Sequence, residues 1–168
     1  CIPFQVDSSS SGRKQHSEVV LARAIRERLA HPEEFILIET MPGPVETLDL
    51  IERELRYMLS MRLHGNVFAA RAGVPFLSLS YNEKHAGFLE MTGMQDFQIV
   101  LRAGEFGLPL MKERIAEIEG RHLEIVAKIW QQTAALQAQV RDGLQKFQRS
   151  CPAFAGSLKV DRGESQCA

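Results

Sequence analysis

The sequence predicts an α/β fold in which a parallel sheet is flanked by helices and is followed by a long helical segment. Short β-rich runs alternate with amphipathic stretches up to Leu101, and such alternation is typical of βαβ units. After Pro109 the alternation stops and apolar residues recur at helical spacing. The chain has 168 residues, of which 45% are hydrophobic, and this suffices for one globular domain with its own core.

Five strands and four helices are expected in the alternating part. Strands are predicted at residues 2–6, 35–38, 57–61, 75–80 and 97–101. Helices are predicted at 17–29, 45–55, 67–72 and 84–91, with Gly73 and Gly93 ending the last two. The first helix carries an apolar stripe made of Val20, Leu21, Ala24, Ile25 and Leu29. We expect a Rossmann-like parallel sheet whose strand order begins 3-2-1-4-5.

The segment after Pro109 predicts one or two long amphipathic helices, with a break at Gly120. Its apolar stripe consists of Met111, Ile115, Ile118, Ile125, Ile129, Leu136, Val140, Leu144 and Phe147. We expect this stripe to pack on the sheet or on a partner; a coiled-coil seam is the alternative, for which the stripe is short. The predicted organisation is an α/β domain over 1–107, a helical segment packed on it over 108–148, and a loose tail over 149–168.

Composition restricts the class of function. The formal net charge is −1, whereas a broad nucleic-acid surface makes a domain strongly basic. Cys1, Cys151 and Cys167 have neither CxxC nor metal-ligand spacing, and a reducing cytoplasm is expected. No apolar run approaches the ~20 residues of a membrane span. The chain opens in strand-like sequence without a methionine, which predicts a fragment of a longer protein.

Ligands of parallel α/β sheets bind beyond the carboxyl ends of the strands, so the loops there are the candidate sites. The loop after the first strand, residues 7–14, is rich in serine and ends in two cations. It lacks the glycine motifs of dinucleotide and P-loop sites. A phosphate site is conceivable there, but a solvated loop is favoured.

The turn after the third strand is the strongest candidate. If the chain is still extended there, Arg62 and His64 project to the same side, and the following helix N-terminus adds free N–H groups. An Arg can fork onto a carboxylate or phosphate, and His titrates near neutral pH. The alternative, equally weighted on spacing, is that Arg62 pairs with an acidic residue and His64 caps the helix.

The loop after the fourth strand is expected to lie beside that turn. It offers Tyr81 as a hydroxyl or stacking face, Lys84 as a point charge, and Glu83 as an acid or base. An ordinary helix start, with Asn82 as N-cap, is favoured for Glu83. The remaining histidines considered, which lack evident partners and are expected on the surface, are His16, His31 and His122.

The run YMLSMRLHGNVFAARAGVPFLSLSYNEK, residues 57–84, resembles the signature of the polysaccharide pyruvyl transferase family. That family carries a similar R-L-H turn, an Ala-rich helix, a G-V-P and a strand ending in Y-x-x-K. The resemblance implies one half of a two-domain GT-B-like fold with two Rossmann-like halves facing a cleft, of which this chain is the C-terminal half. It also implies transfer of the pyruvyl group from phosphoenolpyruvate to sugar hydroxyls in polysaccharide biosynthesis.

Carried onto this sequence, the resemblance makes Arg62 and His64 the expected catalytic residues. The predicted substrate-binding residues are Arg62, His64, Gly65, Asn66, Tyr81 and Lys84. No metal and no cofactor are expected. The expected partners are phosphoenolpyruvate, a glycan acceptor and an N-terminal half-domain; no nucleic acid and no membrane span are expected, and the C-terminal helices offer a route to homo-oligomers.

Two other functions remain open from the sequence. One is a glycosyltransferase half-domain in which the same cationic turn holds the diphosphate of a nucleotide sugar. The other is a non-catalytic interaction module in which the long C-terminal helices dominate.

Overall fold

A computed structural model describes residues 2, 18–40, 42–101 and 107–151 of the chain. The first part contains α1 (Glu18–Arg26), the 3-10 turn η1 (Pro32–Glu34) and α2 (Pro44–Glu54). The central part contains β1 (Met58–Ser60), α3 (Leu63–Ala72), β2 (Phe76–Ser80), α4 (Lys84–Thr92), the 3-10 turn η2 (Gln95–Phe97) and β3 (Gln98–Val100). Two long helices follow, α5 (Leu108–Gly120) and α6 (His122–Ser150).

The sheet has three parallel strands in the order β1-β2-β3. Leu59 of β1 lies opposite Leu77 of β2, and Leu79 of β2 lies opposite Ile99 of β3. The predicted fold class, a parallel sheet flanked by helices with a long C-terminal helix, is therefore confirmed. The predicted order 3-2-1-4-5 is wrong, because the third and fourth predicted strands are direct neighbours here.

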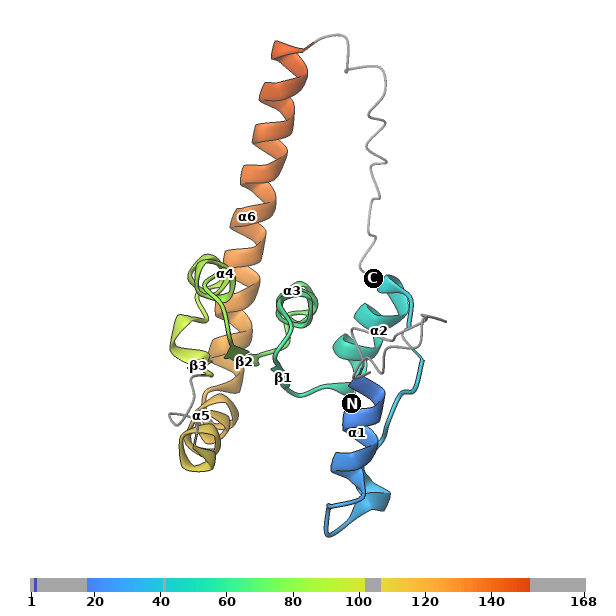
Figure 1. The fold of residues 1–168 in the computed structure, drawn as a ribbon. Coiled ribbons are helices and arrows are strands. Elements are labelled where there is room, and N and C mark those ends of the chain that lie inside the picture. Colours follow the sequence, from blue (N-terminus) through green and yellow to red (C-terminus); the bar gives the residue numbers. More distant parts are fainter. Residues whose placement is uncertain (1, 3–17, 41, 102–106, 152–168) are drawn as a thin grey trace.

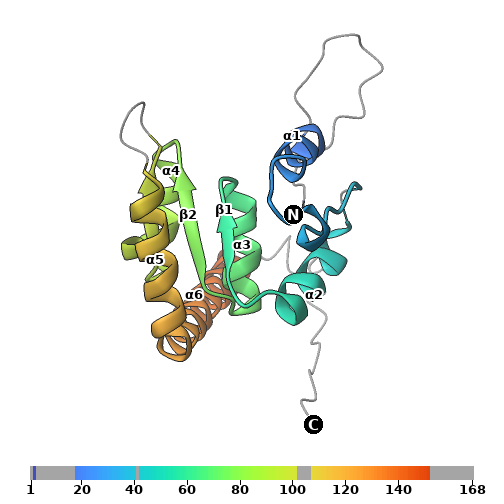
Figure 2. The ribbon, with the colours of Figure 1, turned by 90° about the horizontal axis from the view of Figure 1, so that it is seen from below.

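Helices cover both faces of the sheet. Helices α3 and α4 lie on one side and α5 on the other, as the two perpendicular views show (Figures 1 and 2). The first half of α6 packs against α3 and α4, and α2 packs against α3. β2 is the central strand, and nearly all of its residues are buried. This two-sided cover explains why β2 reads as an apolar run, as parallel strands do.

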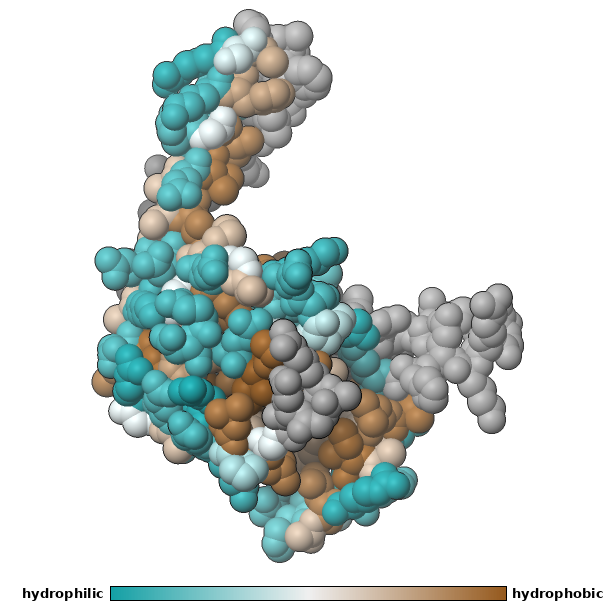
Figure 3. Space-filling view, turned by 60° about the vertical axis from the view of Figure 1, so that its left-hand side comes forward, coloured by the Kyte–Doolittle hydropathy of each residue, from teal (hydrophilic) through white to brown (hydrophobic). Residues whose placement is uncertain are grey.

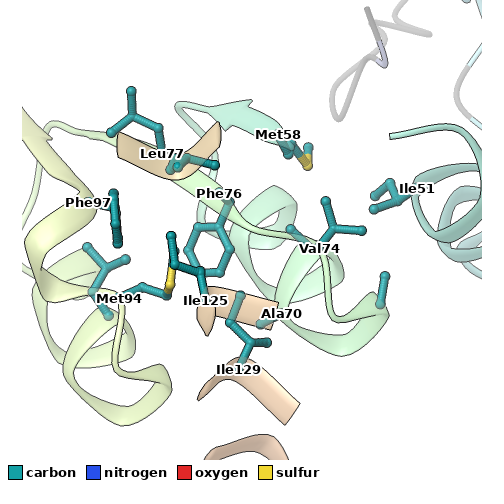
Figure 4. Close-up of a cluster of buried hydrophobic side chains, with 14 of the residues drawn as sticks. Ile51, Met58, Ala70, Val74, Phe76, Leu77, Met94, Phe97, Ile125 and Ile129 are labelled. Carbon is teal, nitrogen blue, oxygen red and sulfur yellow. The ribbon is translucent and has the colours of Figure 1, made fainter. Parts of the chain in front are cut away.

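The hydrophobic core joins the sheet to the helices on both sides (Figure 4). Phe76 and Leu77 of β2 have no exposed surface, and neither do Leu89 of α4 and Ile118 of α5. Gly73 ends α3 in the left-handed region with φ 71° and lies directly beneath the Trp130 ring of α6. A side chain at position 73 would strike that ring, so Gly73 serves both the helix end and the α3–α6 contact.

Two predictions for the first 40 residues are corrected. Residues 35–38 are not assigned as a strand, and Ile36 is 78% exposed. Helix α1 forms as predicted, but it buries Val19 and Ala22, whereas Val20 and Leu21 of the expected stripe are exposed. The predicted strand 2–6 and the loop 7–14 lie outside the described residues, except for Ile2.

The C-terminal helices confirm the predicted break near Gly120 and only part of the predicted packing. Ile118, Ile125 and Ile129 are buried in the core, whereas Val140 and Leu144 are exposed. The second half of α6 projects beyond the sheet, and apolar surface continues along it (Figures 1 and 3). None of the helices in the described ranges is long and apolar enough to cross a membrane. The predicted tail lies, from residue 152 on, outside the described residues.

Candidate functional site

The turn between β1 and α3 is built around Ser60, the last residue of β1. The Ser60 hydroxyl donates to the Arg62 carbonyl at 2.8 Å and accepts from the Arg62 N–H at 3.2 Å. Arg62 has extended backbone geometry, and α3 begins at the next residue. Gly65, in the first turn of α3, lies directly against the Ser60 side chain, where a Cβ would collide with Oγ. The close approach of α3 to β1 therefore depends on Gly65.

The Arg62 guanidinium is bound by Glu18 and lies near Tyr81. Its Nε donates to Glu18 Oε1 of α1 at 2.6 Å, and the Tyr81 side chain after β2 is near enough to influence its charge. These contacts, that with Glu18 foremost, raise the pKa of Arg62 above its usual value. The side chain remains 42% exposed. The alternative that Arg62 pairs with an acidic residue is confirmed, and that residue comes from a helix 44 positions earlier.

His64 is exposed and lies in the first turn of α3. The expectation that Arg62 and His64 project together from an extended chain is wrong, because α3 begins at Leu63 and the two-residue period of a strand does not apply. His64 makes no hydrogen bond to the residues the structure describes. Together with the N–H groups of the α3 first turn, it borders the carboxyl edge of the sheet.

The loop after β2 reaches the same edge, since β1 and β2 are parallel neighbours. Tyr81 follows β2 directly and is 52% exposed. Asn82 Oδ1 accepts from the Lys84 N–H at 3.1 Å. The N-cap of α4 is Glu83, however, and not Asn82 as expected. Lys84 and Glu83 are exposed at the start of α4. The structure therefore brings the Tyr81 side chain near Arg62. Lys84 lies three residues further along the chain, and its side chain makes no hydrogen bond or ion pair with another described residue.

Beneath this edge lies a buried polar network that sequence reasoning missed. The Asn66 amide of α3 donates to Ser78 Oγ of β2 at 2.7 Å, and Ser78 Oγ lies 3.0 Å from His85 Nδ1 of α4 and 3.1 Å from Ser80 Oγ. All four side chains are at most 1% exposed. Burial lowers the pKa of His85 because it disfavours the imidazolium.

Two residues that were predicted to bind substrate lie below the surface, in or beside this network. Asn66 and Gly65 are buried, so in this structure they support the site from behind its surface. A signal for the network exists in the sequence: Ser78 and Ser80 share one face of a buried strand, where hydroxyl groups require partners. His85, four residues past Tyr81, is within reach of that face from the next helix.

Two hollows lie away from this edge. One of about 500 Å³ is lined by Arg56 and residues 119–124, and another of about 420 Å³ by residues 29–31, 34 and 35. His122, expected without a partner, is half-buried and bonds the Arg56 carbonyl at 2.9 Å. His31 is exposed as expected but lies 3.3 Å from Glu33, and His16 is outside the described residues.

The fold and edge define an α/β domain that offers a cation and a helix N-terminus beyond the carboxyl ends of its strands. The family model "Polysaccharide pyruvyl transferase" matches residues 7–83, just under half of the chain. This match confirms the predicted resemblance to that family over the matched residues. It supports pyruvyl transfer in polysaccharide biosynthesis as the general class of function. No curated protein and no solved structure matches the chain.

Proposed function

We propose that this chain binds phosphoenolpyruvate at the Arg62 edge and takes part in transferring its pyruvyl group to a glycan hydroxyl. The observation that carries the proposal is the place of Arg62: its half-exposed guanidinium stands at the first turn of α3, between Glu18 and Tyr81. The Glu18 carboxylate bound at 2.6 Å indicates that this guanidinium accommodates a carboxylate group. Phosphoenolpyruvate offers a carboxylate and a phosphate, both of which suit an arginine and a helix N-terminus.

His64 is the proposed residue for proton transfer. Ketal formation needs a proton at the methylene carbon of the donor and the removal of a proton from the acceptor hydroxyl, and an exposed imidazole suits either step. An imidazolium also stabilises charge that develops on leaving phosphate. Lys84, exposed at the start of α4, is proposed as a further phosphate contact. A second domain facing this edge, as in a GT-B arrangement, supplies the acceptor side in this proposal.

The test is donor binding by the whole chain, followed by turnover. Phosphoenolpyruvate is titrated in a calorimeter against wild type, Arg62→Lys and Arg71→Lys. Arg71 is an exposed arginine at the other end of the same helix and is the matched control. We expect Arg62→Lys to weaken binding about tenfold or more, because lysine keeps the charge but loses the fork, and Arg71→Lys to bind as wild type does.

Turnover is followed as phosphate release with an oligosaccharide acceptor, by the chain together with the proposed second domain. His64→Ala is expected to reduce the rate by about 10²–10⁴-fold if the imidazole transfers a proton. His64→Gln separates hydrogen bonding from proton transfer, since Gln donates but does not titrate. Wild-type activity in Arg62→Lys, His64→Ala and His64→Gln refutes the proposal. Binding of nucleotides in place of phosphoenolpyruvate would instead support the nucleotide-sugar transferase.

A further inference from the structure

The buried network under the site fixes the proton of His85. Asn66 Nδ2 donates to Ser78 Oγ and also faces His85 Nδ1 at 3.4 Å. An amide nitrogen only donates, so Nδ1 must be the acceptor, and the Ser78 hydroxyl donates to it. Ser80 then donates to Ser78. The proton of the neutral imidazole is therefore assigned to Nε2.

Both surface residues of the site are joined to this network. On one side, the Asn66 N–H donates to the Arg62 carbonyl at 3.3 Å, one helical turn below the guanidinium. On the other side, the His85 ring lies against the Tyr81 ring, with centroids 5.6 Å apart and planes at 59°. The Tyr81 side chain in turn lies near the Arg62 guanidinium and helps to raise its pKa. Contacts therefore lead from Arg62 through Asn66, Ser78 and His85 to Tyr81, which lies near Arg62 again.

Packing alone does not explain a histidine at this position. Among the described residues, His85 Nε2 and Asn66 Oδ1 are buried polar atoms without a hydrogen bond. Such atoms cost free energy, and an aliphatic side chain at position 85 would avoid part of that cost. Buried polar groups without a partner are few in native proteins, so each calls for an explanation.

We propose that His85 is a positioning residue, which holds Tyr81 and, through Ser78 and Asn66, keeps the Arg62 guanidinium at a fixed place for an anionic donor. The residue touches no ligand and acts through its neighbours. The role in donor binding rests on the proposed function; the role in fixing Arg62 stands without it.

The first measurement is independent of activity. In the whole ¹⁵N-labelled chain, the Arg62 Nε–H, which donates to Glu18, gives a side-chain signal whose exchange with water reports how firmly the guanidinium is held. We expect His85→Leu to raise this exchange rate about tenfold or more. His85→Asn, whose amide oxygen can replace Nδ1 as acceptor, is expected to restore most of the protection.

Thr92→Val is the matched control. Thr92 is a buried polar residue of the same helix, and its hydroxyl bonds only the Phe88 and Leu89 carbonyls in the described structure. It removes a buried hydroxyl from α4 without touching the network, so the Arg62 signal should not change. If His85→Leu does not fold, Ser78→Ala cuts the link between His85 and Asn66 with a small change of volume, and the same rise in exchange is expected.

The proposal is overturned, whatever the chain binds, if the Arg62 exchange rate in His85→Leu equals that in the Thr92→Val control. The same holds if the rate in Ser78→Ala equals that in the control. The second measurement is the affinity for phosphoenolpyruvate, which we expect His85→Leu to weaken about tenfold and His85→Asn to retain. An altered Arg62 signal in a chain whose wild type binds no phosphoenolpyruvate supports positioning and refutes only the proposed function.

Discussion

Replacing Gly65 with alanine tests how the site is seated on the sheet. The new Cβ would collide with Ser60 Oγ and would lie 3.0 Å from Met58 Cε and 3.2 Å from Ser60 Cβ. Overpacking of this kind costs about 1–3 kcal/mol. Displacing the Ser60 hydroxyl also weakens its bonds to Arg62, at about 1 kcal/mol, whereas alanine gains about 1 kcal/mol over glycine in a helix. The expected net destabilisation is about 1–3 kcal/mol.

A double-mutant cycle identifies the contact responsible. In a Ser60→Ala background the colliding oxygen is absent, so Gly65→Ala should cost about 1–2 kcal/mol less than in wild type. Urea unfolding followed by circular dichroism measures all four proteins. Gly87→Ala is the control, because Gly87 lies within α4 with open space where its Cβ would be, and it should leave stability unchanged or raise it.

The reasoning about Gly65 is refuted in either of two ways. One is a cost for Gly65→Ala no larger than that of the Gly87 control. The other is strict additivity with Ser60→Ala, which would mean that the first turn of α3 does not rest on the Ser60 hydroxyl.

Two further outcomes follow from the described contacts. Gly73→Ala places a Cβ at φ 71° against the Trp130 ring and should lower the unfolding free energy by about 2–4 kcal/mol. Gly143→Ala is the control, since it has open space in α6, and it should raise the unfolding free energy by up to about 1 kcal/mol. A loss of stability at position 73 no greater than at position 143 contradicts this prediction. Burial lowers the pKa of His85 from 6.5, so as the pH falls His85 is protonated in the unfolded chain before it is protonated in the folded chain. The contribution of neutral His85 to the unfolding free energy is therefore complete above about pH 6.5 and is lost below that pH by up to about 1.4 kcal/mol per pH unit. Unfolding midpoints between pH 5 and 7.5 should show this slope in wild type and a smaller one in His85→Asn; equal slopes would contradict the assignment.

Local patterns predicted the elements that tertiary packing reinforces. β1, β2, β3 and the helices between them were predicted because buried parallel strands are apolar runs and glycines such as Gly73 and Gly93 end helices in the left-handed region. The run at 35–38 is also apolar but is not assigned as a strand, since a short apolar run does not say whether a sheet edge is available. The strand order failed for a related reason: which strands become neighbours depends on packing between elements.

The same limit applies to the long stripe on α5 and α6. Its spacing predicted an apolar face over the whole length, and the structure covers that face at Ile118, Ile125 and Ile129 but not at Val140 or Leu144. Periodicity identifies the side of a helix that gains from burial. It contains no information on how far the covering elements extend.

For the candidate site, the sequence predicted Arg62 and Tyr81 but not the residues that contact them, Glu18 and His85. Glu18 lies 44 positions before Arg62, and no spacing rule connects a helix start to a strand end so far away. His85 was passed over because a single histidine in a helix start has no partner in sequence. The serines of β2 were the available signal, since hydroxyl groups at Ser78 and Ser80 in a strand buried on both faces need donors and acceptors from neighbouring helices.

The position of these serines also explains why the polar groups gather at one edge of the sheet. β1 and β2 both begin with large apolar side chains, Met58 and Phe76, and both end in serine. Where neighbouring strands end, their chains diverge into loops and backbone groups lose their sheet partners; Ser60 bonds such groups in the turn at Arg62. In the middle of β2, the Ser78 hydroxyl hydrogen bonds side chains from two helices, Asn66 of α3 and His85 of α4. The change from apolar to hydroxyl side chains along each strand therefore lets α3 and α4 bring Asn66 and His85 together under the carboxyl edge, where the parallel strands direct Arg62 and Tyr81 to the surface.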